Sequence, residues 1–159
     1  LSAPLTSRSE SWPIPDLKVH FMGRDTGLPG NQWPDSAKFN STLDFTVSLP
    51  DGPVTCHGDW IYTQVPTTPF TCSSANVEFQ LGPTSAGTLT ETAFVLSVTR
   101  TETDAGLKTT YLASQEVLAN SPGQPDSYLS CVGGPPLDGI RCTLGGWAGT
   151  AGPLVLSPT

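Results

Sequence analysis

Four cysteines, Cys56, Cys72, Cys131 and Cys142, are the sequence feature that most constrains the fold. They form two close pairs, and the spacing within each pair is too wide for the C-x-x-C arrangement of zinc or thioredoxin-like sites. Neither histidine completes a metal-ligand pattern, so we expect no metal. Four cysteines allow three pairings, and sequence alone does not choose among them. Because each local pair closes a loop that one hairpin or two adjacent strands can bridge, we predict Cys56–Cys72 and Cys131–Cys142.

Two intrachain disulfides indicate an oxidising compartment, which usually means secretion. The triplet Asn40-Ser41-Thr42 supports secretion, because it fits the acceptor sequence for N-glycosylation, a modification of the secretory pathway. Such triplets also occur by chance, and a Ser/Thr-rich strand entry explains this one about equally well. Asn40 is therefore a glycosylation candidate in a protein that we expect to be secreted.

The formal net charge of -7 is accompanied by no cluster of Lys or Arg. Nucleic acids and anionic membranes both require a concentrated positive field, so we expect neither as a partner. No apolar run approaches the roughly 18 residues that a membrane-spanning helix needs. The sequence also has no glycine-rich phosphate loop or other cofactor fingerprint, and we expect no cofactor.

Alternating apolar and polar residues predict short β-strands along most of the chain, most clearly over residues 42–49. Gly- and Pro-rich turns separate these segments, and Asp104-Ala105-Gly106 is expected to be a hairpin tip. Residues 111–120 contain helix-favouring side chains, but the β-favouring residues before them lead us to predict strand through about Glu116. We predict an all-β fold: a single-domain antiparallel β-barrel or sandwich of about 8–11 short strands with two intrachain disulfides.

Residues 1–16 are rich in Ser and Pro and lack periodicity, so we predict a flexible N-terminal arm there. Residues 17–159 are predicted to be the single β-barrel domain. Within it, residues 23–34 contain several glycines and prolines. This composition predicts a long loop and a candidate recognition surface.

Three aromatic residues are candidates for binding a partner: Trp33, Trp12 and Tyr62. Aromatic faces on β-proteins can stack on sugars or on flat phenolic ligands. Trp33 is the best candidate for an exposed anchor, because a proline follows it in a predicted loop. Trp60 and Trp147 are predicted to be structural, with Trp60 packed beside the Cys56 bridge and Trp147 plugging one end of the barrel.

We expect no enzyme activity. The two histidines lie in strand or turn contexts and no G-x-S-x-G motif is present, which argues against a nucleophilic triad. A glycosidase needs two carboxylates, and the sequence offers five on strands or at strand ends: Asp44, Asp59, Glu78, Glu91 and Glu102. Acidic residues at such positions are usually solvated, so a small glycosidase using Glu78 and Glu91 is the weakest hypothesis.

The order of these features resembles the major allergen family of Alternaria and its relatives, which are fungal secreted β-barrel proteins that include cell-death elicitors. The matching features are Ala3-Pro4-Leu5 followed by Ser7-Arg8, Leu43-Asp44-Phe45-Thr46, the spacing of Cys56 and Cys72, Gly133-Gly134 between Cys131 and Cys142, and a short C-terminal strand. Together these features span most of the chain.

The resemblance implies a compact antiparallel barrel without catalytic activity, secreted into the host apoplast. It also implies recognition by plants as an elicitor of hypersensitive cell death and defence responses. The implied partner is a plant defence protein, such as a thaumatin-like protein, or a receptor, with small phenolics as further ligands. The family often has a chain-linking cysteine where this sequence has Ser11-Trp12, so we expect a monomer or a non-covalent dimer. The second hypothesis is a β-barrel that binds a small phenolic or carbohydrate ligand.

Overall fold

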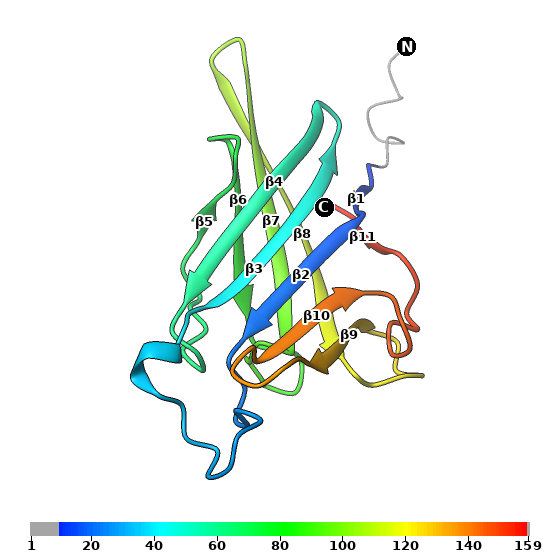
Figure 1. Ribbon diagram of the computed structural model, residues 1–159. Helices are drawn as coiled ribbons and strands as arrows, with labels where there is room; N and C mark the ends of the chain where they lie inside the picture. The colour runs from blue at the N-terminus through cyan, green and yellow to red at the C-terminus, as the bar shows by residue number, and fades with distance from the viewer. Residues whose placement is uncertain (1–9, 159) are drawn as a thin grey trace.

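The computed structural model describes residues 10–158. This part of the chain forms eleven strands and one short 3-10 helix, η1 (Asp35–Ala37). The strands are β1 (Trp12–Ile14), β2 (Asp16–Phe21), β3 (Ser41–Leu49), β4 (Gly52–Trp60), β5 (Phe70–Thr71), β6 (Val77–Gly82), β7 (Ala93–Asp104), β8 (Leu107–Ala119), β9 (Ser127–Gly133), β10 (Ile140–Leu144) and β11 (Leu154–Leu156). The all-β fold predicted from the sequence is confirmed (Figure 1).

Nine of these strands form one sheet in the order β4-β3-β2-β10-β9-β8-β7-β6-β5, while β1 and β11 form a separate two-stranded ribbon. Neighbours in the sheet are antiparallel except β8 and β9, which run parallel. The sheet curls until its two edge strands, β4 and β5, lie beside each other. The result is a nearly closed β-barrel, the first of the two architectures that the sequence left open.

The Cys56–Cys72 disulfide lies at the seam where the sheet closes. Cys56 is on β4 and Cys72 directly follows β5, so the bridge joins the two edges of the sheet. Beside it, the backbone N–H of Ser73 donates to the carbonyl oxygen of Thr55 at 2.8 Å. The N–H of Thr55 in turn donates to the Ser73 hydroxyl at 3.1 Å. One covalent bond and two hydrogen bonds therefore hold the seam.

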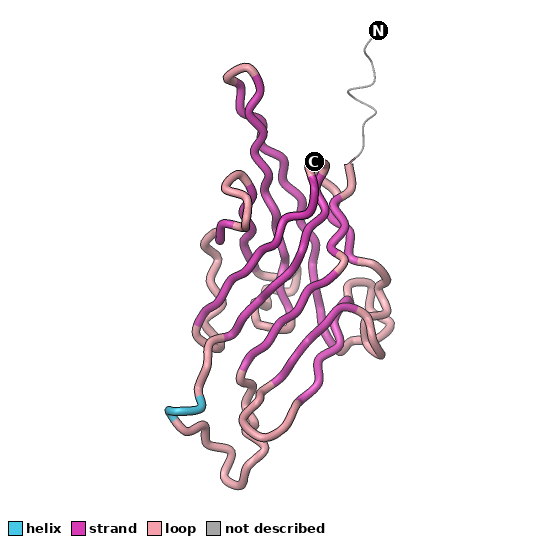
Figure 2. The backbone as a smooth tube through the Cα atoms, turned by 45° about the horizontal axis from the view of Figure 1, so that its top comes forward, coloured by secondary structure: helices cyan, strands magenta, loops and turns pink. Residues whose placement is uncertain are grey.

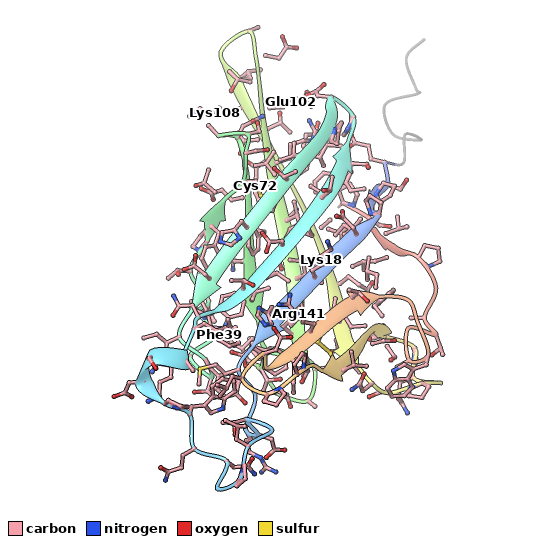
Figure 3. The ribbon with its side chains drawn as sticks, viewed as in Figure 1. Lys18, Phe39, Cys72, Glu102, Lys108 and Arg141 are labelled. Atoms are coloured by element: carbon pink, nitrogen blue, oxygen red, sulfur yellow. A yellow bond between two sulfur atoms is a disulfide. The ribbon has the colours of Figure 1, made fainter. Side chains whose placement is uncertain are left out.

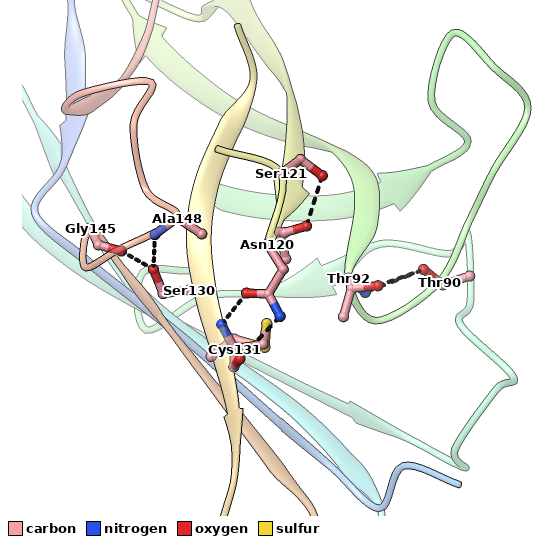
Figure 4. Close-up of a disulfide and its surroundings, with 10 residues drawn as sticks. Thr90, Thr92, Asn120, Ser121, Ser130, Cys131, Gly145 and Ala148 are labelled. Atoms are coloured by element: carbon pink, nitrogen blue, oxygen red, sulfur yellow. Dashed lines mark hydrogen bonds between the residues drawn. A yellow bond between two sulfur atoms is a disulfide. The ribbon is translucent and has the colours of Figure 1, made fainter. Parts of the chain in front are cut away.

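The second disulfide, Cys131–Cys142, joins directly opposed residues of β9 and β10. Next to it, Asn120 connects the end of β8 to β9 (Figure 4): its amide nitrogen donates to the Cys131 carbonyl at 3.0 Å, and its amide oxygen accepts from the Cys131 N–H at 2.7 Å. The side chain thus supplements a parallel pairing of only two positions. Both predicted disulfides are confirmed, and they use all four cysteines, which leaves no thiol to link two chains.

Apolar side chains fill the interior of the barrel. The apolar residues of β3 point inward and are buried, as their alternation predicted. The Phe79 ring lies edge-on to Phe45 at 5.0 Å and stacks on Phe70 at 5.1 Å. Gly58 makes room for these rings, since a Cβ at this position would come within 3.1 Å of Phe70 and Phe79. A ligand would therefore bind at an end of the barrel or on its outer surface.

Residues 12–14, predicted to belong to a flexible arm, instead form β1, which pairs with β11. Trp12 and Ile14 are buried, and Pro13 between them is exposed in a strand with one paired neighbour, where a missing N–H is tolerated. The Trp12 indole donates to the Glu10 carboxylate at 2.9 Å, and the Arg100 guanidinium lies 5.8 Å from the centre of the ring. Residues 1–9 of the predicted arm lie outside the described residues.

The two ends of the barrel differ. At the upper end in Figures 1 and 2, the β7–β8 hairpin extends beyond the other strands. Its turn is formed by Ala105 and Gly106, with φ of 52° and 83°, so the hairpin tip predicted there is confirmed. At the lower end, the loop between β2 and β3, which contains η1, extends below the barrel.

We expect the double variant Cys56→Ala/Cys72→Ala to lose about 3 kcal/mol of unfolding free energy, as the chain-entropy model gives for a loop of this length. Since the variant also frees the edges of β4 and β5, it should self-associate. The matched control Cys131→Ala/Cys142→Ala should lose similar stability but stay unassociated, because β9 and β10 remain paired inside the sheet. Urea unfolding and size-exclusion chromatography at several concentrations measure both effects. Equal association of the two variants would contradict the role given to the seam.

Candidate functional site

The loop between β2 and β3 supplies the first half of the candidate site, at the lower end of the barrel. The Trp33 indole N–H donates to the carbonyl oxygen of Gly23 at 3.1 Å, and its ring meets Phe39 edge-on at 5.8 Å. Phe39, which Figure 3 shows at this end, stacks on His20 at 4.6 Å. Trp33 is therefore half-buried and held by the loop, and it is not the fully exposed anchor that the sequence predicted.

The turn after β4 supplies the second half of the site. Tyr62 stacks on Phe21 at a centroid distance of 5.8 Å, and Ile61 beside it is 60% exposed. A cavity of about 290 Å³ is lined by residues from both halves, including Phe39, Ile61 and Tyr62. We call this surface the aromatic end and define it by five residues: Met22, Trp33, Phe39, Ile61 and Tyr62.

A buried carboxylate holds the turn in place. Glu91 lies between β6 and β7, is 4% exposed, and accepts three hydrogen bonds at one oxygen, Oε2. The donors are the Ser41 hydroxyl at 2.9 Å, the Trp60 indole at 2.9 Å and the backbone N–H of Thr63 at 3.0 Å. Thr63 has a φ of 72°, which is rare for a β-branched residue, and the bond to Glu91 stabilises this conformation. Glu91 thereby fixes the turn that carries Tyr62.

Tyr62 also borders a larger cavity, of about 520 Å³, whose lining includes Phe21, Arg24 and glycines of the β9–β10 loop. Burial raises the pKa of the Tyr62 hydroxyl, the charge of Glu91 adds to this rise, and Arg24 opposes it. The phenol therefore stays neutral at physiological pH. Arg24 is exposed and forms no hydrogen bond or ion pair with another described residue. The lining also includes Asp25, so the cavity presents one basic and one acidic side chain beside the phenol, a polar and aromatic mixture that suits a small polar ligand.

A second polar cluster lies on the outer face of β3 and β4. Here the Nδ1 atom of His57 is 2.6 Å from Asp44 Oδ1, and its Nε2 atom is 3.1 Å from Asp59 Oδ2. The hydrogen bond with Asp44 raises the pKa of His57, burial opposes this, and Asp59 adds to the rise. Since both ring nitrogens already contact a carboxylate, neither is free to act as a general base. The cluster is an ion-pair network across two strands.

The carboxylates considered for a glycosidase do not form one site. Glu78 is exposed on the outer face of β6, and Glu91 is buried at the lower end of the barrel. Glu102 pairs with Arg100 on β7, towards the upper end (Figure 3). Only Asp44 and Asp59 come together, through His57. The sequence identified Glu91 as a carboxylate of interest, but its role here is to position a turn.

Three other predictions about aromatic residues have clear outcomes. Trp12 was a binding candidate, but it is 0% exposed and cannot meet a partner. Trp147 was predicted to plug the barrel, but it is 60% exposed, in a loop where the two glycines before it adopt positive φ. Trp60 is buried as predicted, with its ring 6.3 Å from Phe70. Asn40, the glycosylation candidate, is exposed and lines the smaller cavity.

Within residues 10–158, no group of three His, Cys, Asp or Glu side chains is arranged to hold a metal ion. Nor does this part of the chain contain a helix that is long and apolar enough to cross a membrane.

Comparison of the chain with protein-family models, with curated proteins and with solved structures finds no match. Function is therefore inferred from the geometry of the aromatic end and from the resemblance carried by the sequence motifs.

Glu91→Ala should lower the unfolding free energy by about 3 kcal/mol, because it leaves three buried or half-buried donors without their acceptor. Glu91→Gln keeps an oxygen acceptor and should cost only about 1 kcal/mol. Urea unfolding followed by tryptophan fluorescence measures both values, with the exposed Glu78→Ala as a control that should stay within about 0.5 kcal/mol of wild type. Equal losses for the two Glu91 variants would argue against the proposed hydrogen-bonding role.

The raised pKa of His57 predicts a pH-dependent contribution to stability. Because the folded pKa lies above the unfolded value of about 6.5, the stabilisation is fully present below that pH and is lost as pH rises through the folded pKa. The stability difference between wild type and His57→Gln should therefore shrink as pH rises through this window. Urea midpoints of the two proteins, measured over a pH series, provide the test. A difference that is constant with pH would show that the Asp44 contact does not act through charge.

Proposed function

We propose that the protein is a secreted, non-enzymatic recognition protein of the elicitor or effector type, which contacts its partner through the aromatic end. The observation that carries the proposal is the turn at Ile61 and Tyr62, where Ile61 is 60% exposed, Tyr62 is half-buried and the buried Glu91 fixes the backbone. Large apolar side chains on a preformed turn lose little conformational freedom on binding, which favours affinity. The two disulfides support an extracellular setting.

The plant host in this proposal comes from the family resemblance. That resemblance implied a compact barrel, and the protein has a nearly closed barrel braced by the two disulfides. The same resemblance implies secretion into the apoplast, with a plant defence protein or receptor as the partner. Hypersensitive cell death and defence responses would follow from that contact.

A second candidate function is the binding of a small phenolic or glycan. The observation in its favour is the cavity of about 520 Å³ beside Tyr62, which has the neutral phenol, Arg24 and Asp25 on its walls. Titration with phenolic acids and neutral sugars, followed by intrinsic tryptophan fluorescence, distinguishes the two candidates. A fluorescence shift favours the small-ligand function, whereas the absence of any shift leaves protein recognition as the function.

Infiltration of the purified protein into leaves should cause cell death, and Ile61→Ser should need about tenfold more protein for the same response. The reason is that Ile61 is exposed and absent from the core, so its loss removes contact area without unfolding the barrel. The matched control is Leu107→Ser, at the hairpin tip on the opposite end, where another exposed apolar side chain is removed.

Lesion area and oxidative burst across a dilution series provide the measurement, and Leu107→Ser should match wild type. No response to wild type at saturating dose would reject the elicitor function. Equal potency of wild type and Ile61→Ser would instead reject the aromatic end as the contact surface.

A further inference from the structure

Asn40 lies on the rim of the aromatic end. It directly precedes β3, is exposed, and lines the cavity of about 290 Å³ together with Phe39, Ile61 and Tyr62. Its side-chain amide forms no hydrogen bond with another described residue. Any group attached to this amide would start within the lining of the cavity itself.

The residues after Asn40 complete an acceptor for N-linked glycosylation, and no other asparagine in the sequence has one. In the folded protein Ser41 is buried and donates to Glu91, so the acceptor is fully accessible to a transferase only before β3 forms. Transfer to a chain that is still entering the secretory pathway meets this condition. The two disulfides independently indicate that oxidising environment.

We propose that Asn40 carries an N-linked glycan that covers the smaller cavity and thereby regulates access to the aromatic end. The inference rests on the proposed function, because it concerns the same surface. The donor is a lipid pyrophosphate-linked oligosaccharide. The bond between its anomeric carbon and the pyrophosphate oxygen breaks, and the electron pair leaves with the pyrophosphate. The Nδ2 atom of Asn40 bonds to that carbon and releases one proton to the transferase.

Attachment at this atom determines what the glycan covers. Its first sugar is tethered to the lining of the cavity, so it stays beside Ile61 and Tyr62 however the outer branches move. Sugar rings present apolar C–H faces, which can pack on the exposed part of Ile61. The rest of the oligosaccharide is bulky and hydrated, and an approaching protein meets it first. A glycosylated chain therefore hides apolar surface that the bare chain exposes.

The test uses the whole 159-residue chain, secreted from a eukaryotic host, before and after treatment with a peptide N-glycanase, which removes the entire glycan and leaves aspartate at position 40. Intact mass shows whether Asn40 is modified, and an apolar fluorescent dye reports the exposed apolar surface. Asn40→Gln and Thr42→Val remove the acceptor in two different ways, while Thr42→Ser keeps it as the matched control. We expect the enzyme to reduce the mass of wild type and of Thr42→Ser, and to increase their dye fluorescence and leaf response. The two acceptor-free variants should already resemble the trimmed protein.

The inference would be overturned by a wild-type mass without glycan, by dye fluorescence unchanged by trimming, or by a leaf response unchanged by trimming in a protein that does elicit cell death. A different failure would reject the proposed function alone. In that case trimming increases dye fluorescence as expected, but neither form elicits any response at saturating dose. An increase in dye fluorescence only in Asn40→Gln, and not in Thr42→Val, would assign the effect to the Asn40 side chain and would also overturn the inference.

Discussion

Closure of the sheet at Cys56 and Cys72 is the constraint on which the rest of the structure depends. An open sheet of nine strands would leave β4 and β5 as free edges and would expose the rings of Phe70 and Phe79 between them. Closing it buries these rings and makes an interior that side chains fill. Because side chains fill the interior, a ligand or partner can bind only on the outer surface or at the ends of the barrel. The lower end is formed by loops that closure of the barrel brings together.

The aromatic end shows how an interior polar group can shape an exterior surface. One oxygen atom of Glu91 accepts hydrogen bonds from Ser41 of β3, from Trp60 at the end of β4 and from Thr63 in the turn that follows β4, which lie 28 to 50 residues before it in the sequence. Two strands of the barrel wall and the turn that carries the half-buried Tyr62 are thereby bonded to the same carboxylate. A rigid surface favours binding affinity, because its side chains and backbone lose little conformational entropy when a partner binds.

The regular strands could be predicted from the sequence because alternation depends only on which face of a strand is buried, and β3 follows that rule throughout. Trp12 was predicted to be a binding candidate and not a core residue, since the proline and serine around it favour a flexible arm and its burial depends on β11, more than a hundred residues away. The same limit applies to Glu91, whose hydrogen-bond donors lie 28 to 50 residues before it in the sequence. For Trp147, aromatic character predicted burial, but the residue lies exposed in a glycine-rich loop, where side-chain type alone does not determine burial.

Arg100 marks a boundary along the β7–β8 hairpin. Its guanidinium is 3% exposed and lies between the rings of Trp12 and Tyr111, whereas the strand residues beyond it towards the tip are largely exposed. The ladder of backbone hydrogen bonds nevertheless continues without a break to the tip. Amide protons at Val98 and at Leu107 thus belong to one pair of strands, but the first exchanges with solvent only when the barrel opens and the second when the tip frays. Hydrogen–deuterium exchange along this hairpin would show at which residue amide exchange changes from global opening of the barrel to local fraying of the tip.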